Sequence, residues 1–154
     1  MSSAAPITVL LVEDNPDDVD LVQETLADAT IAQFELRHVD HLEAAHHQLS
    51  IRTFDAVLLD LGLPDSSGLR TLERVLSWRV DVPVVVLTGL TDEVIGTQAV
   101  QLGAEDYLVK GLVGMETLAR NLHFAVERHR LQQARDQAPG GLLGWLRRLF
   151  SIGS

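Results

Sequence analysis

Short apolar runs recur along the chain, and each is too short to form a helix. Four of them are rich in valine and cover residues 9–12, 57–59, 84–87 and 107–109. Runs of this length are typical of strands that are covered on both faces of a sheet. A fifth, weaker strand is predicted at residues 34–39, where Phe34, Leu36 and His38 occupy alternate positions. We therefore expect five strands, most of them buried.

Between these runs, apolar residues recur at every third or fourth position, which is the spacing of one helix face. Asn15 can cap the first helix, and Pro16 suits its first position. The first predicted helix begins after Asn15, the second lies around residues 42–49, and the third covers residues 68–79. The fourth runs from a cap at Thr91 to Gly103, and the fifth from near Gly114 to Arg135. This fivefold alternation of strand and helix predicts an α/β sandwich with a parallel sheet and right-handed crossovers.

Two helices carry a further signal. The buried stripe of the fifth is predicted to consist of four apolar residues: Met115, Leu118, Leu122 and Val126. Gly96 lies inside the fourth and costs about 1 kcal/mol of helix stability relative to alanine. We therefore expect the fourth helix to be the mobile one.

The composition narrows the class of protein. The chain has 154 residues, which is enough for one domain with a real core. Its formal net charge of −10 makes nucleic acid a poor partner, because an acidic surface repels a phosphate backbone. The chain has no cysteine, which excludes disulfides and fits a cytoplasmic location. We see no signal peptide in residues 1–6, and no apolar run reaches the roughly 18 residues of a membrane span.

Polar side chains follow four of the predicted strands at the point where each strand ends. Glu13 and Asp14 follow the first strand, Asp60 the third, Thr88 the fourth and Lys110 the fifth. Since ligands bind at the carboxyl ends of parallel strands, we expect these five residues to converge at one edge of the sheet.

The residue types indicate phosphoryl chemistry. Three carboxylates close together repel one another and need a cation, and oxygen ligands without histidine or cysteine suit Mg²⁺. A carboxylate can act as the nucleophile, while a lysine and a threonine hydroxyl bind phosphoryl oxygens. Lys110 is the only lysine in a chain with eleven arginines, and it stands where a compact ammonium is wanted.

Four motifs in order resemble the receiver domain of bacterial two-component response regulators, over residues 7–130. They are LLVEDN at 10–15, LLDLGLPD at 58–65, VVLTG at 85–89 and GAEDYLVK at 103–110. The resemblance implies a flavodoxin-like (βα)5 sandwich with strand order 2-1-3-4-5. It also implies a single-domain regulator similar to the chemotaxis type, which is a phosphoacceptor and not a conventional enzyme.

The same resemblance implies a role for each residue at the sheet edge. Asp60 would accept a phosphoryl group from the phosphohistidine of a sensor histidine kinase or a phosphotransfer protein. Asp14 and Asp60 would bind Mg²⁺ directly, Glu13 would bind it through water, and the carbonyl of Gly62 would add a ligand.

Three further residues would hold or report the phosphoryl group. Thr88 and Lys110 would bind its oxygens, while the small Gly89 would leave the path to it open. Tyr107 would be the switch: it would turn inward when Thr88 moves, and so change the face formed by the fourth helix, fifth strand and fifth helix. That face is also where the resemblance implies a homodimer.

One residue departs from the family pattern. Gly111 follows the lysine at a position where the family usually has proline, often with a cis peptide bond. A non-proline cis bond costs about 3 kcal/mol, so the geometry of this loop is left open. The contacts that this loop makes with a kinase or another partner depend on that geometry.

Three kinds of protein could use such a site. The first is a stand-alone receiver that acts through protein contacts, and the second is a receiver fragment of a larger hybrid kinase or cyclase. The third is a hydrolase with an aspartyl-phosphate intermediate, of the haloacid dehalogenase type. That class needs a second aspartate two residues after the nucleophile, where this chain has Gly62.

The histidines and the tail are weaker signals. His41, His46 and His47 are interpreted as a solvated helix face rather than a metal site, and His123 and His129 as structural residues without a phosphotransfer role.

The receiver is predicted to occupy residues 1–138, and 139–154 to form a linker with a short basic amphipathic tail. The tail is expected to dock on a protein surface, with membrane contact or disorder as the alternatives.

Overall fold

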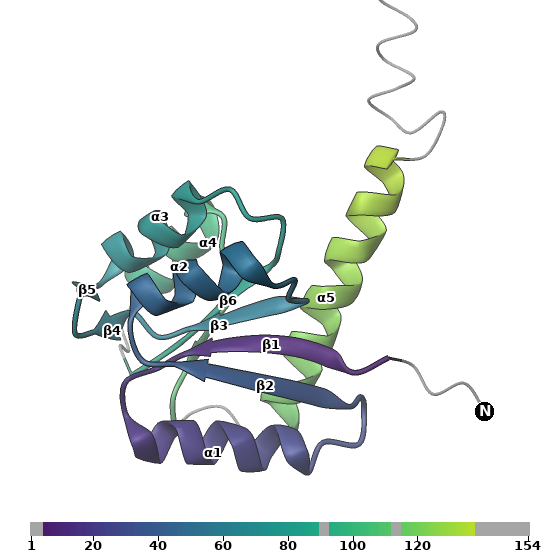
Figure 1. The fold of residues 1–154 in the computed structure, drawn as a ribbon, viewed down its shortest axis with the longest axis horizontal. Helices are drawn as coiled ribbons and strands as arrows, with labels where there is room; N and C mark the ends of the chain where they lie inside the picture. The colour runs from purple at the N-terminus through teal and green to yellow at the C-terminus, as the bar shows by residue number, and fades with distance from the viewer. Residues whose placement is uncertain (1–4, 90–92, 112–114, 138–154) are drawn as a thin grey trace, which may run out of the picture.

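The computed structural model describes residues 5–89, 93–111 and 115–137. Five strands form one parallel sheet at the centre of the molecule (Figure 1). They are β1 (Ile7–Val12), β2 (Phe34–Val39), β3 (Ala56–Leu59), β6 (Val84–Thr88) and β7 (Asp106–Val109). Their order is β2-β1-β3-β6-β7, which is the predicted order 2-1-3-4-5 with the strands of this sheet counted along the chain.

Helices cover both faces of the sheet. They are α1 (Pro16–Ala27), α2 (Leu42–Ile51), α3 (Leu69–Ser77), α4 (Glu93–Leu102) and α5 (Met115–Gln137). Helices α1 and α5 pack on one face, and α2, α3 and α4 on the other (Figure 1). The predicted α/β sandwich is therefore confirmed, and none of the described helices is long and apolar enough to cross a membrane.

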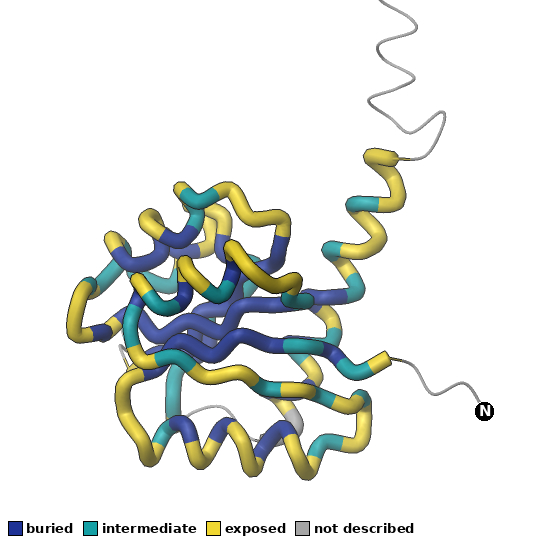
Figure 2. The backbone as a smooth tube through the Cα atoms, viewed as in Figure 1, coloured by how far each residue is buried: buried dark blue, intermediate teal, exposed yellow. Residues whose placement is uncertain are grey.

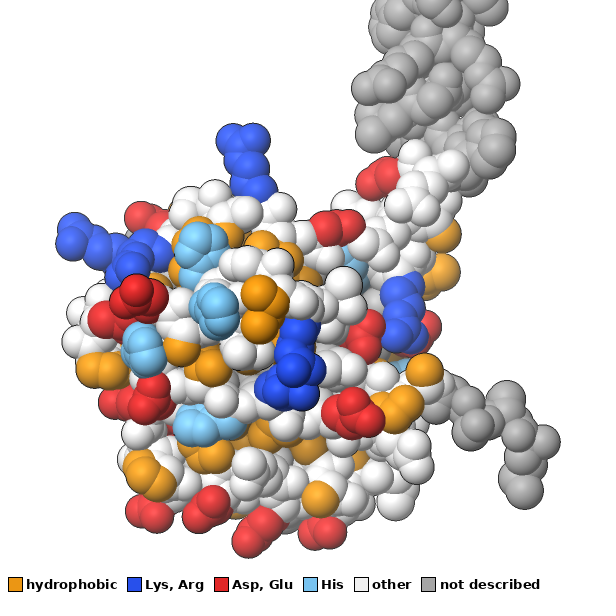
Figure 3. Space-filling view, in the orientation of Figure 1, with side chains coloured by type: hydrophobic (Ala, Val, Ile, Leu, Met, Phe, Trp, Pro, Cys, Tyr) orange, Lys and Arg blue, Asp and Glu red, His pale blue; other side chains and the backbone are white. Residues whose placement is uncertain are grey.

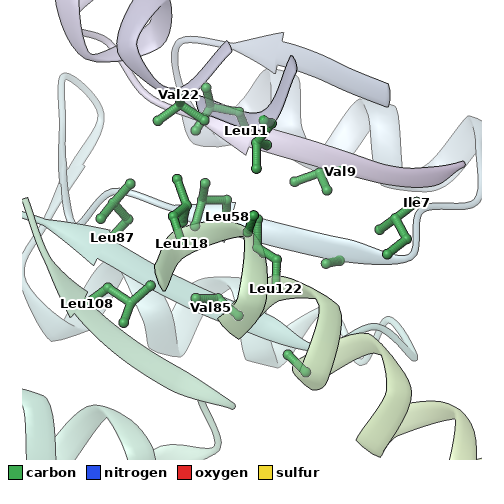
Figure 4. Packing of buried hydrophobic residues seen from close by; sticks show 14 of the residues in the cluster. Ile7, Val9, Leu11, Val22, Leu58, Val85, Leu87, Leu108, Leu118 and Leu122 are labelled. Carbon is green, nitrogen blue, oxygen red and sulfur yellow. The ribbon is translucent and has the colours of Figure 1, made fainter. Parts of the chain in front are cut away.

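Alternate strand residues supply two separate cores, because successive side chains of a strand point to opposite faces. Val9 and Leu11 pack toward α1 and α5, as the close view in Figure 4 shows. Leu10 and Val12 pack toward α2, α3 and α4 on the opposite side. The inner strands are dark blue along most of their length in Figure 2, whereas the edge strand β2 alternates between intermediate and exposed. The runs at residues 9–12, 57–59 and 84–87 are thus buried on both faces, as predicted, whereas the run at 107–109 in the other edge strand, β7, is fully buried only at Leu108.

Helix ends follow the predicted signals where they can be compared. The side chain of Asn15 accepts hydrogen bonds from the backbone N–H groups of Asp17 and Asp18, and Pro16 opens α1. Helix α4 ends before Gly103, whose φ of +131° favours glycine. Helix α5 extends to Gln137. The proposed cap at Thr91 and the tail at 139–154 lie outside the described residues, as does the side chain of Met115.

A two-stranded hairpin was not predicted. It consists of β4 (Gly62–Leu63) and β5 (Ser66–Ser67), which follow directly on Asp60. Its turn carries Asp65, whose carboxylate accepts hydrogen bonds from the backbone N–H groups of Leu42 and Glu43. Asp65 therefore caps α2 from 23 residues away, in place of His41, which makes no side-chain cap. These hydrogen bonds connect the loop after Asp60 to helix α2.

Candidate functional site

The polar residues predicted to converge do lie at one edge of the sheet. Glu13 and Asp14 follow β1, Asp60 follows β3, Thr88 ends β6 and Lys110 follows β7. One carboxylate oxygen from each of Glu13, Asp14 and Asp60 lies within 4.8 Å of the others. Thr88 is buried, and its carbonyl accepts a hydrogen bond from the backbone N–H of Lys110 at 2.8 Å.

The ammonium of Lys110 stands among three carboxylates. Its Nζ lies 2.8 Å from Glu13 Oε2, 2.8 Å from Asp18 Oδ2 and 3.1 Å from Asp60 Oδ2. Glu13 and Asp60 are from the predicted group, whereas Asp18 is a residue that sequence reasoning missed. Asp18 lies in the first turn of α1, where an acidic side chain is also explained by the positive end of the helix. Because the helix start alone accounts for an acid at this position, the sequence did not indicate its contact with Lys110.

Burial sets the protonation behaviour of this cluster. The side chain of Glu13 is only 2% exposed. Burial and the neighbouring Asp60 carboxyl together raise the pKa of Glu13 to about 7, against the opposing effect of the Lys110 ammonium. Burial alone would lower the pKa of Lys110, but its hydrogen bonds to Asp18 and Glu13 and the charge of Asp60 raise it above the ordinary value. Lys110 therefore stays charged at neutral pH.

The residues present fit a hard divalent cation. Glu13, Asp14 and Asp60 offer only carboxylate oxygens, which are the ligands that Mg²⁺ prefers. Three carboxylates contact the single ammonium of Lys110, and Asp14 lies beside two of them, so negative charge exceeds positive charge in this small volume. Asp14 is exposed, which leaves this side of the group open to water.

We expect the stability of the Mg²⁺-free protein to fall as the pH rises from 4.5 toward 7. Folding raises the pKa of Glu13 above its ordinary value of 4.5, so the folded state holds this proton more tightly than the unfolded state. The resulting stabilisation is fully present below pH 4.5 and is lost through pH 7, with a magnitude on the order of 2–3 kcal/mol. Urea unfolding at a series of pH values in EDTA measures it.

The contribution of Glu13 is isolated by comparing variants, because other groups also titrate in this range. Glu13→Gln should flatten the slope, whereas Glu24→Gln, which changes an exposed glutamate of α1, should keep it. Equal slopes for the wild type and both variants would contradict this account of Glu13.

The loop after Asp60 holds the carboxylate in place. Its Oδ1 accepts a hydrogen bond from the backbone N–H of Gly62 at 3.1 Å, while Oδ2 faces Lys110. Asp60 is 6% exposed. A Cβ added to Gly62 or to Gly89 would meet no atom within 4 Å, so the space beside both glycines is open. The Asp60 carboxylate is thus fixed at both oxygens.

The ring of Tyr107 packs against α4 at Gly96. A Cβ added to Gly96 would lie 3.0 Å from Cδ1 of Tyr107, closer than ordinary van der Waals contact. Gly96 was predicted only to weaken α4, and whether this helix is mobile stays a prediction. The structure adds a packing reason for the glycine, since any larger residue would meet the aromatic ring.

Gly96→Ala should therefore displace the ring of Tyr107. Alanine favours the helix by about 1 kcal/mol, but its methyl group occupies space that the ring now fills, so we expect the net gain in stability to be smaller than that. Tyr107 is the only tyrosine of the chain, which makes its ring NMR signals easy to assign. They should shift in Gly96→Ala and stay unchanged in Thr97→Ala, an exposed position of α4. Unchanged ring signals in Gly96→Ala would contradict the packing described here.

The backbone after Lys110 takes a conformation that proline cannot adopt. Gly111 has a φ of +83°, a conformation that favours glycine, and the described residues contain no cis peptide bond. Glycine at this position is thus explained by the backbone conformation alone.

The histidines do not form a second centre. His46 stacks on Trp78 with ring centroids 4.5 Å apart, and His41 pairs with Asp40. Histidine side chains lie spread over the face around α2 in Figure 3. Among the described residues, the only group placed to hold a metal ion is Glu13, Asp14 and Asp60.

Comparison with known proteins places this site in a family. The sequence model of the response regulator receiver domain matches residues 9–122. The transcriptional regulatory protein BasR of Escherichia coli is 33% identical over 137 residues, covering 87% of this chain and 59% of that protein. KdpE of Staphylococcus aureus is 31% identical, covering 66% of this chain and 42% of that protein. The chain thus spans about half the length of the curated relatives it matches.

Solved structures agree on the fold. The receiver domain of a LuxO repressor protein from Vibrio parahaemolyticus superimposes with a TM-score of 0.76 at 24% identity, covering 87% of this chain and all of that one. The phosphorylated cyanobacterial phytochrome response regulator RcpA gives a TM-score of 0.61 at 27% identity, covering 82% of this chain and 93% of that one. The family match over most of the chain and the shared fold show that this protein belongs to the response regulator receiver domain family.

Proposed function

We propose that the protein accepts a phosphoryl group on Asp60 in an Mg²⁺-dependent reaction and uses it as a signalling switch. One observation carries the proposal. The buried Asp60 carboxylate contacts the ammonium of Lys110 and lies close to the carboxylates of Glu13 and Asp14. Membership of a family of phosphoacceptor domains supports the same reading.

In the transfer, an oxygen of Asp60 attacks the phosphorus of a phosphohistidine. A new O–P bond forms, the P–N bond breaks, its electron pair stays on the imidazole nitrogen of the donor, and a proton from solvent neutralises the ring. The product is an acyl phosphate on Asp60 and a neutral histidine on the partner. The chain's own contribution is placement and charge, since the nucleophile is already held by Gly62 and Lys110.

Mg²⁺ would be held by Asp14, Asp60 and the carbonyl of Gly62, with Glu13 acting through water. The ion supplies positive charge that neutralises the phosphoryl oxygens and the surrounding acids. On the other side of the phosphoryl group, the ammonium of Lys110 would bind a second oxygen. Without the ion, the four acids of the site, with only one lysine among them, would repel an incoming phosphate.

Thr88 and Tyr107 would carry the change of state outward. The hydroxyl of Thr88 would donate a hydrogen bond to the phosphoryl group, and Gly89 would keep the approach clear. Tyr107, which now packs on Gly96 of α4, would then turn inward and alter the face of α4, β7 and α5. A partner protein or a second copy of the chain would recognise that face.

The partner in phosphotransfer is proposed to be a sensor histidine kinase or a phosphotransfer protein, in the cytoplasm. We propose a regulator that acts through protein contacts, with a receiver inside a longer protein as the alternative, as the longer curated relatives illustrate. Hydrolase activity is not favoured, since Gly62 supplies no carboxyl group that could act as a general acid.

Incubation with acetyl phosphate tests the proposal. Asp60 should gain one phosphoryl group from this donor with loss of acetate, seen as an intact-mass increase that appears with Mg²⁺ and disappears with EDTA. Beryllofluoride, which mimics a phosphoryl group, should bind under the same Mg²⁺ condition. Absence of both modification and binding in the presence of Mg²⁺ would refute the proposed function.

A further inference from the structure

All three hydrogen-bond donors of the Lys110 ammonium are matched by acidic acceptors. An ammonium has three N–H groups, and Nζ lies within 3.1 Å of one oxygen from each of Glu13, Asp18 and Asp60. If Lys110 is to bind a phosphoryl oxygen, one of these contacts has to be given up. Which one is released determines how the site responds to phosphate.

Asp18 is directed toward Lys110 by the way α1 begins. An acid at the third helical position commonly reaches back to the N–H of the capping residue. Here the N–H of the capping residue Asn15 donates to Oε1 of Glu13 at 3.1 Å. The carboxylate of Asp18 therefore has no cap to complete, and its Oδ2 lies 2.8 Å from the ammonium. The start of α1 and the end of β7 are joined through this pair.

Among the three acceptors, Asp18 is the one that can leave at least cost. Its side chain is 30% exposed, compared with 2% for Glu13 and 8% for Asp60, so water can replace the lost contact. It also lies outside the group of three carboxylates that can share a metal ion. Glu13 and Asp60, by contrast, belong to that group and are buried.

We propose that Asp18 is a positioning residue that holds Lys110 in the resting state and is displaced from it by a phosphoryl oxygen. The proposal rests on the proposed function. Asp18 competes with the phosphoryl group for the same ammonium and adds a negative charge beside it. Both effects oppose phosphoryl binding, so the presence of Asp18 lowers the affinity of the site for phosphate.

Asp18→Asn should therefore raise the affinity for beryllofluoride. Because the substitution removes a competing, partly exposed ion pair and one negative charge, we expect the affinity for beryllofluoride to increase about three- to tenfold. The titration is performed at saturating Mg²⁺ for each variant and is followed by NMR. Asp17→Asn is the matched control, because it removes the same charge from the same turn at an exposed position. We expect its affinity to change by less than about twofold.

The single lysine provides a readout specific to the mechanism. With ¹⁵N-labelled lysine, the only side-chain ammonium signal comes from Lys110. This signal should move in Asp18→Asn and stay in place in Asp17→Asn. Beryllofluoride should move the signal of the wild type as well. A substitution that altered only the helix would leave the ammonium signal unchanged.

The outcomes separate this inference from the proposed function. If the wild type binds beryllofluoride and Asp18→Asn binds with equal or lower affinity, Asp18 is not a competitor and the inference is overturned, while the proposed function stands. An equal gain in Asp17→Asn would assign the effect to general charge and also overturn it. If the wild type neither binds beryllofluoride nor takes up a phosphoryl group from acetyl phosphate, the proposed function itself fails.

Discussion

Asp60→Asn is expected to abolish the Mg²⁺-dependent uptake of a phosphoryl group from acetyl phosphate. An amide is a far weaker nucleophile than a carboxylate and cannot form the acyl phosphate. The substitution should not unfold the protein, since it removes one charge from a cluster in which acids outnumber the ammonium of Lys110. We expect the Mg²⁺-free variant to be as stable as the wild type or slightly more stable.

Two measurements check this expectation together. Intact-mass spectrometry reports phosphoryl uptake, and urea unfolding in EDTA reports stability. Asp20→Asn, which changes an exposed acid of α1, serves as the charge-matched control and should be phosphorylated normally. Full phosphorylation of Asp60→Asn would mean that another residue is the acceptor.

Lys110→Met should slow phosphorylation by about a hundredfold or more, because it removes the one side-chain cation that contacts the Asp60 carboxylate in the described part of the chain. Methionine keeps the apolar stem but leaves the acids without their ammonium partner. Without Mg²⁺, we therefore expect a loss of stability of about 2 kcal/mol, less than for a fully buried pair since Lys110 is 20% exposed. Saturating Mg²⁺ should restore much of this stability.

A second substitution separates charge from geometry. Lys110→Arg keeps the positive charge, and so should keep most of the Mg²⁺-free stability. Its planar fork cannot occupy the position of a compact ammonium between three carboxylates, so phosphorylation should remain slow. Stability is followed by urea unfolding and phosphorylation by intact mass. Normal phosphorylation of Lys110→Met would contradict the role given to this residue.

The architecture and most of the site could be predicted because they depend on strong local signals. Strands buried on both faces require continuous apolar residues, and parallel strands bring their carboxyl ends to one edge. Glu13, Asp14, Asp60 and Lys110 each follow such a run directly, so their convergence did not depend on detailed packing. The resemblance in the four motifs then supplied the expected roles.

Three features could not be predicted because they depend on contacts between distant segments. Asp18 contacts Lys110 across 92 residues, and Asp65 caps α2 from the hairpin after Asp60. Gly96 is explained by the ring of Tyr107 on a neighbouring strand. In each case the residue also had a sufficient local explanation: an acid at a helix start, an aspartate in a turn, or a glycine that weakens a helix. Local patterns could therefore not reveal the partner.

The central claim is that Asp60 carries the phosphoryl group, and chemical trapping tests it most directly. The wild type is phosphorylated with acetyl phosphate and Mg²⁺ and reduced with borohydride, which converts an aspartyl phosphate to homoserine. Peptide mass spectrometry then locates the modified residue. We predict homoserine at position 60 and at no other aspartate. Modification at another residue, with position 60 unchanged, would contradict the account.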